Sequence, residues 1–161
     1  MGATIRPLVA ADAPDVLALN EEVVHKLAPM DEERYGWFLD VAAGAWAAEV
    51  DGCFAGFVLL LGPGLTYDSD NYRWFSEHHD RFVYLDRVAV GAAHRRRGVG
   101  SAIYDAVEAF AAERGEPLLL EVNVVPRNEA SLAFHAQRGF AEVGTLEHPG
   151  PKVVSLLAKV P

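Results

Sequence analysis

The chain has 161 residues, with 14 Lys and Arg against 23 Asp and Glu, which gives a formal net charge of −9. This length suits one domain with its own core, and a content of 51% hydrophobic and 23% charged residues excludes a disordered chain. The acidic balance argues against general affinity for nucleic acid or for an anionic membrane. The excess of acidic over basic side chains lies in residues 1–94, which hold 6 basic and 15 acidic side chains, whereas residues 95–161 hold 8 of each.

The first predicted elements are an edge strand and a helix. Residues 4–8 are predicted to form the strand, at an edge because Pro7 donates no ladder hydrogen bond. Asp12 is the predicted N-cap of a helix that ends before Pro29. Apolar residues recur along that helix at helical spacing, namely Val16, Leu17, Leu19, Val23, Val24 and Leu27.

A second helix and a hairpin follow. The helix is predicted from Asp31 to about Ala43, with Gly44 at its end. Asp51-Gly52 predicts a two-residue turn between strands at 45–50 and 53–61, since both central residues of such a turn need a positive φ. Residues 65–80 are polar and aromatic without a clean period, and they predict a long functional loop.

The second half alternates strands and helices. A helix over 99–114 carries an apolar face and is stopped by Gly115, and a helix capped by Asn128 ends at Gly139. The predicted strands, of which the second is buried on both faces, are 81–90, 117–125, 140–146 and 153–160. No repeat or linker interrupts the pattern, so the sequence predicts one α/β domain over residues 1–161.

The cysteine content and the apolar runs of the sequence indicate the cellular compartment of the protein. Cys53 is the only cysteine, so it forms no internal disulfide and leaves no cysteine-rich metal site. The N-terminus lacks the order of a signal peptide, and the longest apolar run, residues 54–61, is too short to span a bilayer. These features predict a cytoplasmic protein. No spaced carboxylate or cysteine completes a zinc set with His78 and His79, so no metal is expected.

The most informative segment runs from Val88 to Ser101, where a strand leads through a basic turn into an amphipathic helix. Such a turn directs backbone N–H groups at an anion, and the helix dipole adds positive potential. Gly98 and Gly100 let the backbone approach a phosphate without a Cβ in the way. The arginines at 95–97 add charge-assisted donors. The segment therefore predicts an anion-binding turn.

Two familiar phosphate motifs do not fit this turn. It lacks the Gly-Lys-Ser/Thr ending of a Walker loop and the third glycine of the dinucleotide fingerprint. Arg95, Gly98 and Gly100 instead occupy the fixed positions of the pattern Arg/Gln-x-x-Gly-x-Gly/Ala. A second stretch, from Asn123 to Phe140, contributes Asn128, Ala130, Phe134 and Gly139.

With both stretches in order, the sequence resembles the GNAT superfamily of acyl-CoA-dependent N-acetyltransferases over nearly its whole length. Within it, the sequence is most similar to a bacterial branch marked by residues 71–75 and by Asp86-Arg87. The resemblance implies an α/β (α+β) fold, with a mixed, mostly antiparallel central sheet flanked by helices. The fourth and fifth strands of that sheet would splay apart to admit the cofactor.

The resemblance also implies acetyl-CoA as the acyl donor. Strand backbone would pair with its pantetheine arm, and the amides of the basic turn would hold its pyrophosphate. Asn128 would lie near the arm or the diphosphate. The implied cofactor-binding residues are Val88, Ala89, Val90, Arg95, Arg96, Arg97, Gly98, Val99, Gly100, Ser101, Asn128, Ser131 and Phe134.

Direct acyl transfer to an amine needs a base for the amine and an acid for the leaving thiolate. Glu121 is the favoured base, and Asp86 is the alternative unless it forms a structural ion pair with Arg87. The family often has a tyrosine acid where this chain has His135. An imidazolium is a competent acid near neutrality, so His135 either replaces that phenol or packs beside the cofactor. Tyr84 and Tyr104 are further candidates.

The loop at 65–80 is where the resemblance places the acceptor pocket. Its predicted substrate-binding residues are Tyr72, Arg73, Trp74 and Phe75. A guanidinium suits a substrate carboxylate and the acidic surroundings suit an amine, so an amino-acid-like acceptor satisfies both. The alternative is that these aromatic residues only pin the loop to the core.

The predicted function is transfer of an acetyl group from acetyl-CoA to a primary amine of a small molecule or peptide, in a ternary complex. One alternative is an acyl-CoA sensor of the same fold without turnover. Another is an acyltransferase with a longer acyl donor or a hydroxyl acceptor. Edge strands would also allow a homodimer.

Overall fold

Most of the elements predicted for the first third of the chain are present in the structure. The computed structural model describes residues 2–23 and 27–161. Strand β1 (Thr4–Pro7) is followed by the short helix η1 (Ala10–Asp12), α1 (Ala13–Glu22), α2 (Glu32–Val41), β2 (Gly44–Val50) and β3 (Cys53–Leu61). The β2–β3 turn has φ values of 53° at Asp51 and 77° at Gly52, which confirms the predicted hairpin turn.

The structure differs in detail from three expectations for these elements. Asp12 is the N-cap residue of α1, as predicted, but its side chain makes no capping hydrogen bond there; it instead accepts one from the Val9 N–H at 2.8 Å. Gly44 does not end α2, because Ala42 is its C-cap and Gly44 already begins β2. Helix α1 ends at Glu22, short of the predicted boundary, and Val24 lies outside the described residues.

The predicted loop at 65–80 contains a helix. Helix α3 (Asp70–His78) begins where the Ser69 hydroxyl accepts a hydrogen bond from the Tyr72 N–H at 3.2 Å. Tyr72 and Phe75, which lie three residues apart and therefore on one face of the helix, are both buried. A serine N-cap followed by this spacing was the signal for the helix, but no clean apolar period over residues 65–80 supported it.

The second half follows the prediction closely. Its elements are β4 (Val83–Val90), η2 (Ala92–His94), α4 (Val99–Arg114), β5 (Leu118–Val125), α5 (Glu129–Gln137), β6 (Ala141–His148) and β7 (Lys152–Lys159). Gly115, with φ of 65°, ends α4 as expected. The Asn128 side chain caps α5 by accepting a hydrogen bond from the Ser131 N–H at 3.2 Å.

The strands form one seven-stranded sheet with the order β1-β2-β3-β4-β5-β7-β6. The pairs β1–β2, β2–β3, β5–β7 and β6–β7 are antiparallel. Strands β4 and β5 run parallel and pair through their first two residues, Val83 with Leu118 and Tyr84 with Leu119. The fold is therefore the mixed, mostly antiparallel sheet with helices that the resemblance implied, with β1 at an edge.

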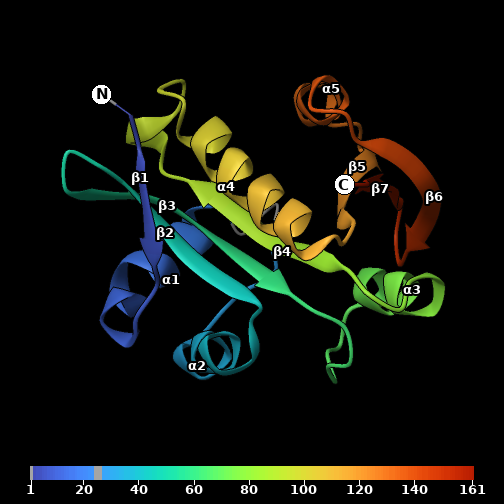
Figure 1. The fold of residues 1–161 in the computed structure, drawn as a ribbon, viewed down its shortest axis with the longest axis horizontal. Coiled ribbons are helices and arrows are strands. Elements are labelled where there is room, and N and C mark those ends of the chain that lie inside the picture. The colour runs from blue at the N-terminus through green and yellow to red at the C-terminus, as the bar shows by residue number, and fades with distance from the viewer. Residues whose placement is uncertain (1, 24–26) are drawn as a thin grey trace. The chain divides into compact units, whose positions relative to one another are not determined.

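The chain divides into two compact units. The first comprises Met1–Leu61 with Leu85–Phe110, and the second comprises Gly62–Tyr84 with Ala111–Pro161. In the first unit, Trp46 of β2 packs edge-to-face on Phe110 of α4, with ring centroids 5.3 Å apart. In the second, α3 lies near one end of β6 and α5 near the other (Figure 1). That the whole chain acts as one domain stays a prediction.

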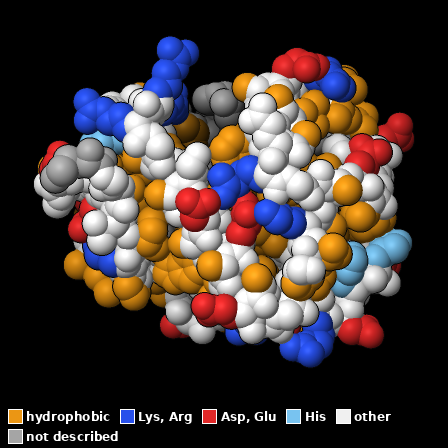
Figure 2. Space-filling view, turned by 45° about the horizontal axis from the view of Figure 1, so that its top comes forward, with side chains coloured by type: hydrophobic (Ala, Val, Ile, Leu, Met, Phe, Trp, Pro, Cys, Tyr) orange, Lys and Arg blue, Asp and Glu red, His pale blue; other side chains and the backbone are white. Residues whose placement is uncertain are grey.

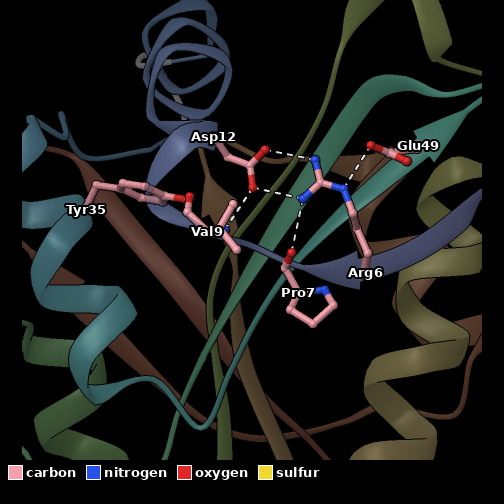
Figure 3. Close-up of polar contacts among 6 residues, drawn as sticks. All are labelled: Arg6, Pro7, Val9, Asp12, Tyr35 and Glu49. Carbon is pink, nitrogen blue, oxygen red and sulfur yellow. Dashed lines mark hydrogen bonds and ion pairs between the residues drawn. The ribbon is translucent and has the colours of Figure 1, made fainter.

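A polar network joins β1 to the start of α1 in the first unit (Figure 3). The Arg6 guanidinium donates to both carboxylate oxygens of Asp12, at 2.8 and 2.9 Å, and to Glu49 at 2.8 Å. Arg6 holds the pKa of Asp12 below its ordinary value, and the Val9 N–H adds to that effect. The Tyr35 hydroxyl donates to the Val9 carbonyl at 2.7 Å, and burial raises the pKa of Tyr35 to about 12.

Asp12→Asn is expected to lower the free energy of unfolding by about 2 kcal/mol at neutral pH, because the buried asparagine no longer carries the charge that faces Arg6. The lowered pKa of Asp12 means that its ionised form stabilises the fold above the unfolded pKa of about 4. That contribution is lost as the pH falls through the lower, folded pKa. Urea unfolding across this acid range should show a flatter pH dependence in the variant.

The matched control is Glu49→Gln, which removes the more exposed carboxylate on the same guanidinium. Solvent screens that pair, so its loss should cost under about 1 kcal/mol. Equal pH dependence of wild type and Asp12→Asn would contradict the role given to Asp12.

Candidate functional site

The basic turn of the first unit connects β4 to α4. After η2, residues 95–98 form a turn in which Arg96 and Gly98 have φ values of 62° and 77°. The first bond of α4 runs from the Ala102 N–H to the Gly98 carbonyl at 3.0 Å. The N–H groups of the helix's first turn, residues 99–101, therefore have no acceptor within the helix and remain to be satisfied from outside it.

The arginines of this turn are exposed. Arg95, Arg96 and Arg97 all lie at the surface, and Arg95 Nε donates to the Val90 carbonyl at 3.4 Å. Basic side chains project from the surface where this turn lies (Figure 2). The turn thus presents positive charge next to helix N–H groups, which is the arrangement that binds phosphate.

Both glycines of the motif face open space. A Cβ placed on Gly98 or Gly100 would have no atom of the chain within 4 Å. Gly98 has an additional reason to be glycine, because its φ is 77°. Gly100 lies within α4 without a positive φ, where glycine costs up to about 1 kcal/mol relative to alanine. The fold gives no reason for a glycine there, and a ligand that approaches the backbone closely would supply one.

Strand β4 leads into the turn and is shaped by a glycine on its neighbour β3. A Cβ on Gly56 would lie 2.5 Å from the Ala89 carbonyl oxygen and 3.3 Å from Val90 Cα. Beyond this contact, the Gly91 N–H donates to the Ala55 carbonyl at 2.8 Å. Gly56 therefore permits the close approach of backbone at two of the predicted cofactor-binding residues. Its position inside an apolar strand was the signal for such an approach.

Asp86 and Arg87 form a buried ion pair in β4. Arg87 Nε lies 2.9 Å from Asp86 Oδ2, with both side chains about 5–6% exposed. Arg87 also donates to Asn20 Oδ1 at 3.1 Å and to the Ala28 carbonyl at 3.0 Å, and it lies over the Phe38 ring. This pair matches the structural alternative considered for Asp86, whose catalytic role stays a prediction.

In the second unit, α5 carries three of the predicted site residues, Ser131, Phe134 and His135. His135 is 5% exposed, and the rings of Phe134 and Phe140 pack on it edge-to-face. Its Nδ1 lies 2.7 Å from the Ser131 carbonyl and 3.3 Å from the Ser131 hydroxyl. A carbonyl only accepts, so Nδ1 carries the proton, and any proton that His135 exchanges with a ligand would be on Nε2.

Glu121, the favoured base, is bonded to another candidate. The Tyr84 hydroxyl donates to Glu121 Oε1 at 2.7 Å. Tyr84 is 1% exposed, and the rings of Tyr72 and Phe75 each lie 5.7 Å from its ring. The structure thus brings together Glu121 and Tyr84, which the sequence proposed separately.

The predicted acceptor residues divide between the two sides of α3. Tyr72 and Phe75 are buried, and the Tyr72 hydroxyl donates to the Gly62 carbonyl at 2.7 Å. Arg73 is exposed and forms an ion pair with Asp70 at 2.6 Å. The half-buried Trp74 indole packs on β6, where a Cβ at Gly144 would lie 2.7 Å from it.

The histidines at the end of α3 are held by the same helix. The His78 ring stacks on Trp74, with centroids 3.7 Å apart, and its Nδ1 lies 2.7 Å from the Trp74 carbonyl. Burial, with a contribution from His78, lowers the pKa of His79. Over residues 2–23 and 27–161, no group of three or more His, Cys, Asp and Glu side chains is placed to hold a metal ion.

A family model for the acetyltransferase (GNAT) family matches residues 12–140, which is most of the chain. The chain belongs to this family. Both motif stretches of this GNAT protein lie inside the match. No curated protein sequence is significantly similar to it.

Solved structures share the GNAT fold. The ribosomal-protein-alanine N-acetyltransferase from Brucella melitensis is 23% identical, with a TM-score of 0.74, over 98% of this chain and 99% of that one. Arabidopsis thaliana NAA60 in complex with a bisubstrate analogue is 17% identical, with a TM-score of 0.75, over 99% and 98% of the two chains. Arabidopsis thaliana Naa50 with the analogue CoA-Ac-MVNAL is 16% identical, with a TM-score of 0.74, over 99% of each chain.

At these identities the likeness shows the fold alone. Membership of the GNAT family identifies this protein as an acyl-CoA-dependent acetyltransferase, without naming its acceptor. Within the ranges that the structure describes, none of the helices combines the length and hydrophobicity needed to cross a bilayer.

Proposed function

We propose that this GNAT protein transfers an acetyl group from acetyl-CoA to a primary amine of a small molecule or peptide. The observation that carries the proposal is the turn at 95–101, where two glycines face open space beside exposed arginines and the N–H groups of α4. The reaction is direct transfer in a ternary complex, without a metal. Acetyl-CoA, when bound, supplies an activated acyl thioester.

The turn fits an anionic cofactor. The N–H groups of Val99, Gly100 and Ser101 and the side chains of Arg95, Arg96 and Arg97 would hold the pyrophosphate. The backbone of Val88, Ala89 and Val90 would bind the pantetheine arm. In the second unit, Asn128, Ser131 and Phe134 are the proposed contacts, although the side chain of Asn128 already caps α5.

Glu121 is the proposed general base. Its carboxylate accepts the Tyr84 hydroxyl, and a donor of this kind favours the ionised form, which is the form that takes a proton from an ammonium. His135 is the proposed acid, since a proton on Nε2 would complement the Nδ1 proton held by the Ser131 carbonyl. Asp86 is less suited to proton transfer, because its carboxylate is buried and already engaged by Arg87.

The proposed acceptor is amino-acid-like. Arg73 is exposed on α3 and would attract a carboxylate, although it already pairs with Asp70. The acidic excess of residues 1–94 suits the amine group. Peptide N-termini belong to the same chemical class, and the analogue in the Naa50 structure joins CoA to a peptide. Tyr72 and Phe75 are buried, so they would act indirectly, by packing in the core and holding α3 in place.

Acetyl-CoA titrated into wild type and into Gly100→Ala, followed by calorimetry and thermal unfolding, tests the cofactor part. We expect wild type to bind with a rise in Tm by mass action. Without ligand, the variant should unfold at the same or a higher temperature, because alanine is the better helix former. Its affinity should be about tenfold lower, because the new methyl group occupies the space through which the ligand approaches. Equal affinity in both proteins would refute the placement of the pyrophosphate.

Thiol release from acetyl-CoA with amino acids, polyamines and peptide N-termini tests the transfer. We expect release that depends on one class of small amine and formation of its N-acetyl product. Binding without release would favour the sensor, and product with a hydroxyl compound or with longer acyl-CoA would favour the other alternative. A strict preference for long basic proteins would refute the amino-acid-like acceptor.

A further inference from the structure

A buried tyrosine hydroxyl is bonded directly to the proposed base. Tyr84 Oη lies 2.7 Å from Glu121 Oε1, and the Tyr84 side chain is 1% exposed. Glu121 is half-buried, and a hydrogen bond to an ionised carboxylate is stronger than one between neutral groups. The phenol can only donate to an ionised carboxylate, which assigns the proton in this pair to Tyr84.

We propose that Tyr84 is a positioning residue that orients the Glu121 carboxylate and keeps it ready to accept the proton of the acceptor amine. This inference rests on the proposed function, in which Glu121 is the base. Tyr84 itself transfers no proton: its hydroxyl donates to Oε1 throughout, and one carboxylate orientation is retained. The tyrosine thereby loses the role of general acid that the sequence left open for it.

Helix α3 holds Tyr84 in place. The Tyr72 and Phe75 rings lie on the Tyr84 ring at centroid distances of 5.7 Å, with interplanar angles of 66° and 49°. Phe82 also packs on Tyr72, at 5.8 Å. The ring of Tyr84 therefore has fixed neighbours, and its hydroxyl is presented to Glu121 in one direction. This gives the buried face of α3 a role in orienting the base.

The surroundings of Glu121 on its own strands are neutral. Along β5, the residues two positions away are Leu119 and Asn123, and Leu156 of β7 lies opposite in register. Tyr84 of β4 faces it from the neighbouring strand, and Tyr72 of α3 packs on the Tyr84 ring. Both phenols are neutral in the range where a carboxylate titrates, so the donated hydrogen bond is the contact expected to tune Glu121.

Tyr84→Phe removes this hydrogen bond and keeps the ring. We expect kcat to fall about tenfold, while KM for acetyl-CoA stays within about twofold, because the loss concerns the base rather than cofactor binding. The acidic limb of the pH–rate profile should move up by about one pH unit, since the carboxylate binds a proton more readily without the donor. A residue that is only structural would leave that limb in place.

The matched control is Tyr35→Phe. Tyr35 is also buried, and its hydroxyl also makes a bond of 2.7 Å, but to the Val9 carbonyl in the first unit. This variant should lose a similar amount of stability and keep the wild-type pH profile. Circular dichroism and thermal unfolding of both variants verify that they are folded.

Protonation of Glu121 can be followed by NMR through the chemical shift of its side-chain carboxyl carbon, in wild type and in Tyr84→Phe. This measurement does not depend on enzymatic activity. We expect its midpoint to move up together with the acidic limb. Movement of the NMR midpoint without movement of the limb would show that Glu121 is not the base, so the proposed function would fail at that residue. If neither moves, or if Tyr35→Phe moves the limb equally, the role of Tyr84 is overturned while Glu121 can still be the base.

Discussion

Glu121→Gln is expected to lower kcat for acetyl transfer by about 10²- to 10⁴-fold, because a glutamine cannot accept the proton of the acceptor amine. The substitution keeps the size of the side chain, and the amide oxygen can still accept the Tyr84 hydroxyl. The fold and the affinity for acetyl-CoA should therefore be nearly unchanged. Steady-state kinetics over a range of pH, with calorimetric titration of acetyl-CoA, measure both quantities.

Glu142→Gln is the matched control, since it removes one carboxylate from the same unit. Glu142 lies on β6, is exposed and accepts a hydrogen bond from the Ser155 hydroxyl. Its kcat should stay within about twofold of wild type. A Glu121→Gln protein with wild-type kcat at every pH would exclude Glu121 as the base and return Asp86 to consideration.

Gly56→Ala is expected to destabilise the protein by about 3 kcal/mol, because the added methyl group meets backbone rather than a movable side chain. The new Cβ would lie 2.5 Å from the Ala89 carbonyl oxygen, so β3 or β4 must shift. That shift would displace the β4 residues proposed to bind the pantetheine arm. We therefore expect weaker acetyl-CoA binding in addition to the loss of stability, as measured by urea unfolding and calorimetry.

Gly36→Ala provides the control within the first unit. Gly36 lies inside α2, and a Cβ there would have no atom within 4 Å. This variant should gain up to about 1 kcal/mol, because alanine is the better helix former, and it should bind acetyl-CoA as wild type does. If Gly56→Ala unfolds at the same urea concentration as wild type, the close approach of β3 and β4 does not require a glycine.

Elements that depend on nearest neighbours in the chain could be predicted from the sequence. Helix α4 has the predicted bounds, because its apolar face and Gly115 are local signals. The Asp51-Gly52 turn and the Asn128 cap are local too, and both have the expected geometry. The geometry of the basic turn at 95–98 belongs to this group, since its glycines, arginines and helix start are consecutive in sequence.

Contacts between distant residues could not be predicted in the same way. Asp12 holds the predicted N-cap position, but its side chain binds Arg6 of β1, which also binds Glu49 of β2, instead of capping α1. Helix α3 was missed because residues 65–80 show no clean apolar period, and its Tyr72 and Phe75 pack on Tyr84 of β4. Tertiary packing outweighed local propensity in both places.

The sequence by itself determined the family, most of the elements and the basic turn before α4, because each depends on residue types at short, fixed spacing. Only the tertiary structure decided that Tyr84 bonds Glu121, that Arg87 pairs with Asp86 and reaches Asn20, and that Gly56 is needed against Ala89. Apart from the neighbours Asp86 and Arg87, each of these contacts joins residues that lie more than thirty positions apart in the sequence. Which charge faces which partner therefore depends on the tertiary structure, whereas the total charge depends on composition alone.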